Sequence, residues 1–144
     1  MHTDFEILGI HIRILANGVQ TSKKYEMFEI TAEKVGLGPG LHFHRQMQEL
    51  FYIVSGQVVF TIDNKKIVAK SGDHLIVPKG VHHGWNTYGN DPIKMIITFS
   101  PAKNQIGYYQ GLEALSRSGR SWHEAIIPLS EQFDNFPVDL PHAK

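Results

Sequence analysis

The chain has 144 residues, which is close to the commonest size of a single domain. Its 14 basic and 14 acidic side chains give a formal net charge of zero, so the composition offers no electrostatic reason to expect nucleic acid as a partner. Cysteine is absent and histidine occurs nine times, so any metal site must use nitrogen and oxygen ligands.

The first residues lack the features of a secretory leader. The acidic Asp4 stands where a signal peptide is basic, and Gly9, His11 and Arg13 interrupt the apolar stretch that follows. No run of about 18 apolar residues occurs in the sequence. We therefore expect a soluble, cytoplasmic protein with no membrane partner.

Residues 7–99 show a pattern of short strands separated by turns. Apolar and polar residues alternate from Leu8 to Ile14, which predicts a strand with one buried face. The dipeptide Asn17-Gly18 then predicts a two-residue hairpin turn. Further strands are predicted at 25–30, 41–44, 49–54, 58–62, 67–69, 75–77 and 93–99. Because no helical pattern separates these strands, the sequence predicts an all-β sandwich or barrel.

The pattern changes after Pro101. Apolar residues recur every three positions from Ile106 to Leu115, which predicts an amphipathic helix ending near Gly119. Ser121 and Glu124 have the spacing of a capping box and predict the start of a second helix. Pro128 is expected to kink or end that helix, and the tail from residue 136 to be irregular. We expect a barrel over 1–100 and a short C-terminal helical extension over 101–144 packed outside it.

The segment from Gly36 to Glu49 contains the most informative histidines. In a strand, residues two apart point to the same side, so His42 and His44 project together and can share a metal ion. Glu49 lies five residues further on and can supply a third ligand after a chain reversal. An isolated carboxylate on an apolar face would be costly, and a metal ion would offset that cost.

The second informative segment is Gly72–His83. Together the two segments resemble the paired motifs of the cupin superfamily. The first motif is matched by Gly36, His42, His44, Glu49 and Gly56. The second is matched by Gly72, Pro78, Gly80 and His83. One element departs from the pattern, because Asn86 comes one residue early and Thr87 occupies the expected asparagine position.

The resemblance implies a double-stranded β-helix, or jelly roll. It also implies that four side chains converge at one end of the barrel and bind one divalent transition metal per chain: His42, His44, Glu49 and His83. Imidazole and carboxylate ligands suit Fe, Mn, Ni, Co or Zn, and four protein ligands leave positions open for other molecules.

The functional class is left open between three alternatives. The first is a mononuclear non-haem metal enzyme, dioxygenase-like, acting on a small organic molecule. The second is a non-catalytic protein in which the metal organises a small-molecule pocket, and the third is a cupin isomerase or lyase. The resemblance also implies a homodimer.

Several residues outside the ligand set are weaker candidates. Tyr25, Met27, Tyr52 and Trp85 are candidates either to line the pocket or to support the metal ligands from behind. His82 neighbours His83 and is expected to point to the opposite face. His74 and the four histidines outside both motifs are expected to be structural or solvated.

Overall fold

The computed structural model describes residues 4–138, except for the side chain of His123. Eleven strands and two helices occur in this part of the chain. The strands are β1 (Asp4–Ile7), β2 (Ile10–Ala16), β3 (Glu26–Ala32), β4 (His42–Phe43), β5 (Gln48–Ser55), β6 (Gln57–Ile62), β7 (Lys65–Lys70), β8 (His74–Val77), β9 (His83–Tyr88), β10 (Ile93–Ser100) and β11 (Phe136–Pro137). The helices are α1 (Gln105–Arg117) and α2 (Trp122–Gln132).

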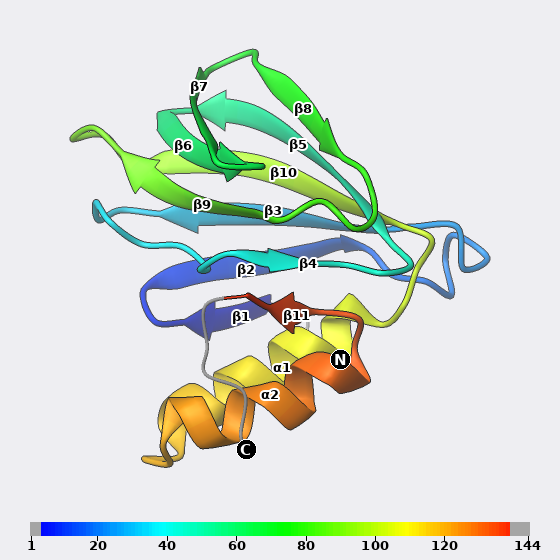
Figure 1. Cartoon of the computed structure of the whole chain (residues 1–144). Helices are drawn as coiled ribbons and strands as arrows, with labels where there is room; N and C mark the ends of the chain where they lie inside the picture. Colours follow the sequence, from blue (N-terminus) through cyan, green and yellow to red (C-terminus); the bar gives the residue numbers. More distant parts are fainter. Residues whose placement is uncertain (1–3, 139–144) are drawn as a thin grey trace.

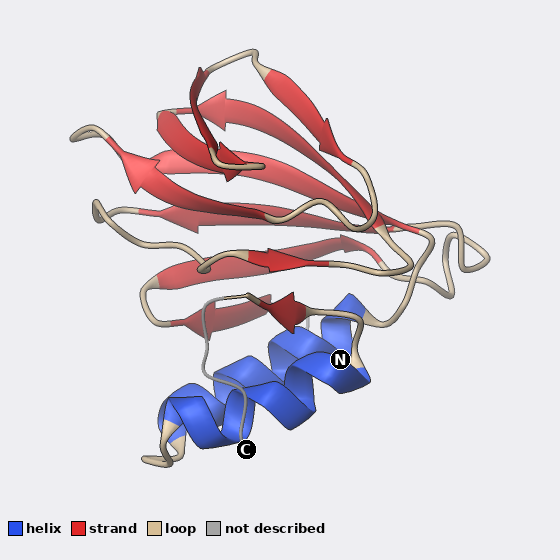
Figure 2. Ribbon diagram, in the orientation of Figure 1, coloured by secondary structure: helices blue, strands red, loops and turns tan. Residues whose placement is uncertain are grey.

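The strands form two antiparallel sheets that enclose one core (Figure 1). One sheet has the order β1-β2-β3-β10-β5-β8 and the other the order β11-β4-β9-β6-β7. Strands that are consecutive in the chain therefore often lie in different sheets, as in a jelly roll. The predicted fold, mostly β with two C-terminal helices, is confirmed (Figure 2).

Residue alternation explains how the sheets enclose the core. Along β10 the inward residues are buried and apolar, while the outward positions are more exposed. The strands β3 and β5 follow the same period-2 pattern. The largest fully buried apolar side chains include Phe28, Phe51, Phe60, Phe99 and Ile97.

The first predicted strand, from Leu8 to Ile14, begins with a tight turn, and β1 precedes it as a strand that the pattern did not predict. Ile7 pairs with Ile10, so Leu8 and Gly9 form a two-residue hairpin loop between β1 and β2. Both residues have positive φ, 49° and 88°, as a type I′ turn requires. Leu8 tolerates this conformation poorly, which is why the alternating pattern alone did not predict a turn here.

The prediction of a two-residue hairpin turn at Asn17-Gly18 is wrong. The chain instead forms a longer loop over 17–25, and the positive φ values fall at Ser22 and Lys23. Asn17 and Gln20 close part of this loop through reciprocal hydrogen bonds from backbone N–H to side-chain oxygen, each 2.9 Å long. The Asn-Gly signal therefore marked the loop but not its length.

The two helices pack together beside β1 and β11 (Figure 1). The buried carboxylate of Glu26 on β3 accepts hydrogen bonds from the N–H groups of Gln105 and Ile106, at 2.8 and 3.3 Å. A carboxylate at a helix N-terminus accepts hydrogen bonds from the free N–H groups there and interacts favourably with the positive end of the helix dipole. This contact attaches α1 to the inner face of the sheet.

Three sequence-based details of the C-terminal region need correction. The second helix begins after Ser121 as predicted, but the capping box does not form, because the Ser121 side chain makes no capping hydrogen bond. Of the two effects expected of Pro128, a kink or an end of the helix, the end does not occur, because Pro128 lies inside α2. The tail includes the short strand β11, in which Phe136 pairs with Phe43 and Pro137 with His42.

Within residues 4–138, no helix has the length and apolar character needed to cross a membrane.

Candidate metal centre

The structure brings His42, His44, Glu49 and His83 together. One potential ligand atom from each side chain lies within 4.8 Å of the others. Two ligands on opposite sides of one ion are about 4.2 Å apart when each bond is about 2.1 Å long, so this span is close to that of a metal site. Glu49, His44 and His83 are buried and His42 is half-buried.

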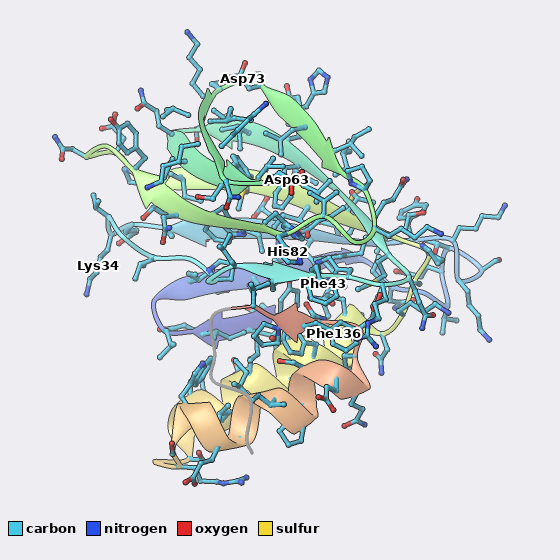
Figure 3. The ribbon with its side chains drawn as sticks, viewed as in Figure 1. Lys34, Phe43, Asp63, Asp73, His82 and Phe136 are labelled. Atoms are coloured by element: carbon cyan, nitrogen blue, oxygen red, sulfur yellow. The ribbon has the colours of Figure 1, made fainter. Side chains whose placement is uncertain are left out.

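Both sheets contribute to the cluster. His42 lies on β4 directly across from His83 on β9, and Glu49 lies on β5 in the other sheet. His42 and His44 point inward together, as the alternation predicted. Phe43 points outward and stacks on His82 and on Phe136, with ring centroids 5.1 and 5.3 Å apart (Figure 3). The predicted outward direction of His82 is confirmed.

The imidazole rings are each held by a backbone carbonyl. The Nδ1 atoms of His42, His44 and His83 lie 2.8, 2.8 and 2.9 Å from the carbonyl oxygens of Gly40, Asp134 and Val81. A carbonyl oxygen only accepts hydrogen bonds, so Nδ1 carries the proton in all three rings. The Nε2 atom of each neutral ring is then free to bind a metal, an arrangement typical of histidine ligands.

The Glu49 carboxylate lies between two of the imidazole rings. Its Oε1 atom is 3.1 Å from Nε2 of His44 and 2.9 Å from Nε2 of His83. The side of each ring that faces Glu49 is therefore the side on which a metal ion would bind. A divalent ion placed there meets three imidazole Nε2 atoms and one negative charge. The donor set therefore fits a metal ion.

The pKa values follow from burial and from these contacts. Burial and the neighbouring His83 and His44 lower the pKa of His42 to about 3, so its ring is neutral at physiological pH. Burial opposes the charge of Glu49, but hydrogen bonds from His44 and His83 outweigh it and lower the pKa to about 2. Burial also opposes the charge of His44, but the contact with Glu49 prevails and raises its pKa.

Comparison with known proteins identifies the family of this region. Residues 29–99 match the cupin domain family. This region is a cupin domain. The match includes all four residues of the cluster, and the two helices lie outside it.

The cupin domain has distant relatives of different kinds. It is 34% identical over 67 residues to an uncharacterized protein of Methanocaldococcus jannaschii, and 28% identical over 72 residues to quercetin 2,3-dioxygenase of Bacillus subtilis. These matches cover 46% and 50% of this chain, but only 54% and 21% of the two relatives. The chain thus spans about half or less of the length of either relative.

A solved structure shows the same fold. KdgF from Halomonas sp. superposes with a TM-score of 0.63 at 21% identity, covering 73% of this chain and 91% of that chain. At this level of identity the likeness is one of fold.

Asp134 is the residue that the sequence analysis missed. It lies after α2, outside the cupin domain, and is buried. Its carboxylate accepts hydrogen bonds from three consecutive backbone N–H groups, those of Arg45, Gln46 and Met47, at 2.7, 2.9 and 3.1 Å. Its carbonyl holds the ring of His44. Asp134 therefore positions the turn between His44 and Glu49.

Thr87 replaces the asparagine of the cupin motif and supports the glycine-rich loop. Its hydroxyl donates to the carbonyl of Lys34 at 2.7 Å and accepts from the N–H of Leu37 at 3.1 Å. Its own N–H donates to the carbonyl of Leu37 at 2.8 Å. The departure from the motif therefore leaves this loop well supported.

Thr87→Val is expected to lower the free energy of unfolding by about 1–3 kcal/mol, because it removes the hydroxyl while keeping the shape of the side chain. Thr87→Ser keeps the hydroxyl and is expected to stay closer to the wild type. Urea unfolding of the three proteins measures both effects. Equal stability of Thr87→Val and the wild type would contradict this role of the hydroxyl.

A cavity of about 400 Å³ adjoins the cluster and is lined by His42 and Glu49. Trp85 also lines it, as predicted for a pocket residue. Tyr25, Met27 and Tyr52 are not among its lining residues, so the prediction that they line the pocket was wrong. Met27 and Tyr52 alternate with inward residues and therefore occupy the outer face of their sheet.

Proposed function

We propose that this protein is a mononuclear metal-dependent enzyme that acts on a small organic molecule by dioxygenase-type chemistry. The observation that carries this proposal is that two of the four candidate ligands, His42 and Glu49, line a cavity of about 400 Å³. A metal held by a structural site is enclosed by protein ligands, whereas a catalytic metal keeps open positions toward a substrate cavity.

The residues of the chain determine which metals the site accepts and how they are held. Three imidazoles and one carboxylate suit Fe, Mn, Ni, Co or Zn. When bound, such an ion supplies Lewis acidity and, in the case of iron, redox chemistry toward dioxygen. Backbone carbonyls fix the orientation of the three rings, and Glu49 balances one of the two positive charges.

The dioxygenase assignment is supported by a relative. Quercetin 2,3-dioxygenase of Bacillus subtilis is similar to half of this chain. The similarity covers only 21% of that enzyme, so it supports the class of chemistry and not its substrate.

Oxygen consumption tests the proposal. The protein loaded with Fe(II) is expected to consume oxygen with at least one of four substrate classes: catechols, flavonols, β-diketones and thiols. The zinc-loaded protein is the control for redox chemistry, since zinc does not change oxidation state. His42→Ala is expected to lower the rate by about 100-fold or more, since one ligand is lost.

The two alternatives predict different outcomes. Stoichiometric metal binding without turnover of any compound would replace the proposal by a non-catalytic, metal-organised binding protein. Turnover that needs no oxygen and proceeds with zinc would replace it by an isomerase or lyase. The homodimer and the cytoplasmic location stay predictions.

A further inference from the structure

The cavity beside the metal centre has two walls of different origin. One wall comes from the inner face of the six-stranded sheet and includes Ile12, Ile30, Ile97 and Phe99. The other comes from the two helices and includes Tyr108, Leu112, Trp122 and Ile126. The helical wall lies outside residues 29–99, so the match to the cupin family assigns no role to it.

The helical wall presents an apolar surface to the cavity. Of the four residues named for this wall, Tyr108 carries a hydroxyl, which lies 3.3 Å from the hydroxyl of the fully buried Ser130. The polar end of Tyr108 thus has a partner within the protein, and its ring is available to a ligand. Aromatic and aliphatic walls of this kind favour apolar, ring-shaped ligands.

The polar groups of the cavity continue from the metal centre. Asn135 follows Asp134, whose carbonyl contacts His44, and the Nδ2 atom of Asn135 donates to Oε1 of Gln105 at 3.0 Å. His42, Glu49, Gln105 and Asn135 all line the cavity. The polar side chains that a bound molecule would contact therefore lie together, next to the metal centre. The two walls described above are apolar.

The charge of the cavity restricts its ligand further. Among the described residues that line it, none is lysine or arginine, and Glu49 is the only carboxylate. A divalent ion beside one carboxylate leaves a single net positive charge to balance a ligand. A ligand with two or more negative charges would bury charge without a partner, which is strongly unfavourable.

We propose that this cavity binds an aromatic molecule with one metal-chelating pair of oxygen atoms, and that Tyr108, Leu112, Trp122 and Ile126 determine its specificity. The ring lies between the sheet and the two helices, and the oxygen pair faces His42 and Glu49. This inference rests on the proposed function, because it uses the same metal centre.

Tryptophan fluorescence of the zinc-loaded protein tests the inference without any turnover. The chain has two tryptophans, Trp85 and Trp122, and both line the cavity. The probe is tropolone, an aromatic chelator that binds a metal ion as a monoanion and whose absorption overlaps tryptophan emission. Acetohydroxamate chelates metals without an aromatic ring, and malonate is an aliphatic dianion. Both compounds compete with the probe for the zinc ion. Their affinities are therefore measured from the fluorescence that returns when they displace the probe.

We expect tropolone to quench the fluorescence saturably and to bind at least tenfold more tightly than either competitor. Leu112→Gln is expected to lower the affinity for the probe about tenfold while the zinc content stays unchanged. Val19→Gln is the matched control, since Val19 is 91% exposed and lies outside the cavity. Equal affinity for malonate, or wild-type affinity in Leu112→Gln, would overturn the inference.

The wild-type ranking of the three compounds decides the inference even if Leu112→Gln fails to fold. Failure of the inference is also distinguishable from failure of the proposed function. Quenching without oxygen consumption keeps the ligand class and rejects the dioxygenase. Oxygen-dependent turnover of an aliphatic polyanion, without binding of the probe, keeps the enzyme and rejects the ligand class.

Discussion

His42→Ala is expected to abolish stoichiometric metal binding while the fold is retained. The variant removes one imidazole from the cluster but leaves Glu49 with its hydrogen bonds from His44 and His83. His44→Ala also removes a ligand, but it takes a partner from a buried carboxylate and is expected to destabilise the protein by about 3–5 kcal/mol. Elemental analysis of purified protein measures the bound metal, with about one ion per chain expected for the wild type.

An exposed histidine provides the matched control for this experiment. His74 lies on the outer face of β8, so His74→Ala is expected to keep the wild-type metal content. A chelator is expected to lower the melting temperature of the wild type and of His74→Ala. It should leave the melting temperature of His42→Ala unchanged. A metal ion stabilises the folded state only in a protein that binds it, and this variant has no bound ion for the chelator to remove. Equal metal content in His42→Ala and the wild type would reject the assignment of the site.

Asp134→Ala is expected to lower both stability and metal affinity. It leaves three backbone N–H groups without their carboxylate acceptor, and one of them, that of Met47, is buried. We expect the free energy of unfolding to fall on the order of 3 kcal/mol. Since these N–H groups form the turn between His44 and Glu49, metal affinity is expected to fall about 10–100-fold.

Two further variants separate this role from a general effect of the substitution. Asp134→Asn keeps one side-chain carbonyl oxygen and is expected to lie between Asp134→Ala and the wild type. Glu131→Ala removes an exposed carboxylate from the end of α2 and is expected to behave as the wild type. Urea unfolding of the metal-free proteins and competition with a metal indicator measure the two quantities. Unchanged metal affinity in Asp134→Ala would show that the turn needs no support from the C-terminal region.

Local pattern and the family resemblance predicted the cluster but not the contacts around it. The inward direction of His42 and His44 follows from the two-residue period of a strand. Glu49 follows as a third ligand after a chain reversal, and the resemblance to the cupin motifs adds His83. The carbonyl that orients His44 belongs to Asp134, 90 residues later in the chain. A backbone carbonyl carries no side-chain signature, so no sequence pattern connects these two positions.

The helical wall of the cavity was unpredictable for a related reason. The period of Ile106, Tyr109, Leu112 and Leu115 predicts a helix with one apolar face. This period does not distinguish a face that packs against the barrel from a face that lines a cavity, because both need the same residue types. The difference depends on the carboxylate of Glu26, which attaches α1 to the sheet through a contact between residues 79 positions apart.

The distance in sequence between His44 and Asp134 has a consequence during synthesis. The ribosome makes the chain from the N-terminus, so all four candidate ligands emerge well before the residue that holds His44 and its turn. A nascent chain that ends before Asp134 contains the complete ligand set without its final orientation. The metal centre reaches its full geometry only when α2 has been made and has folded against the barrel.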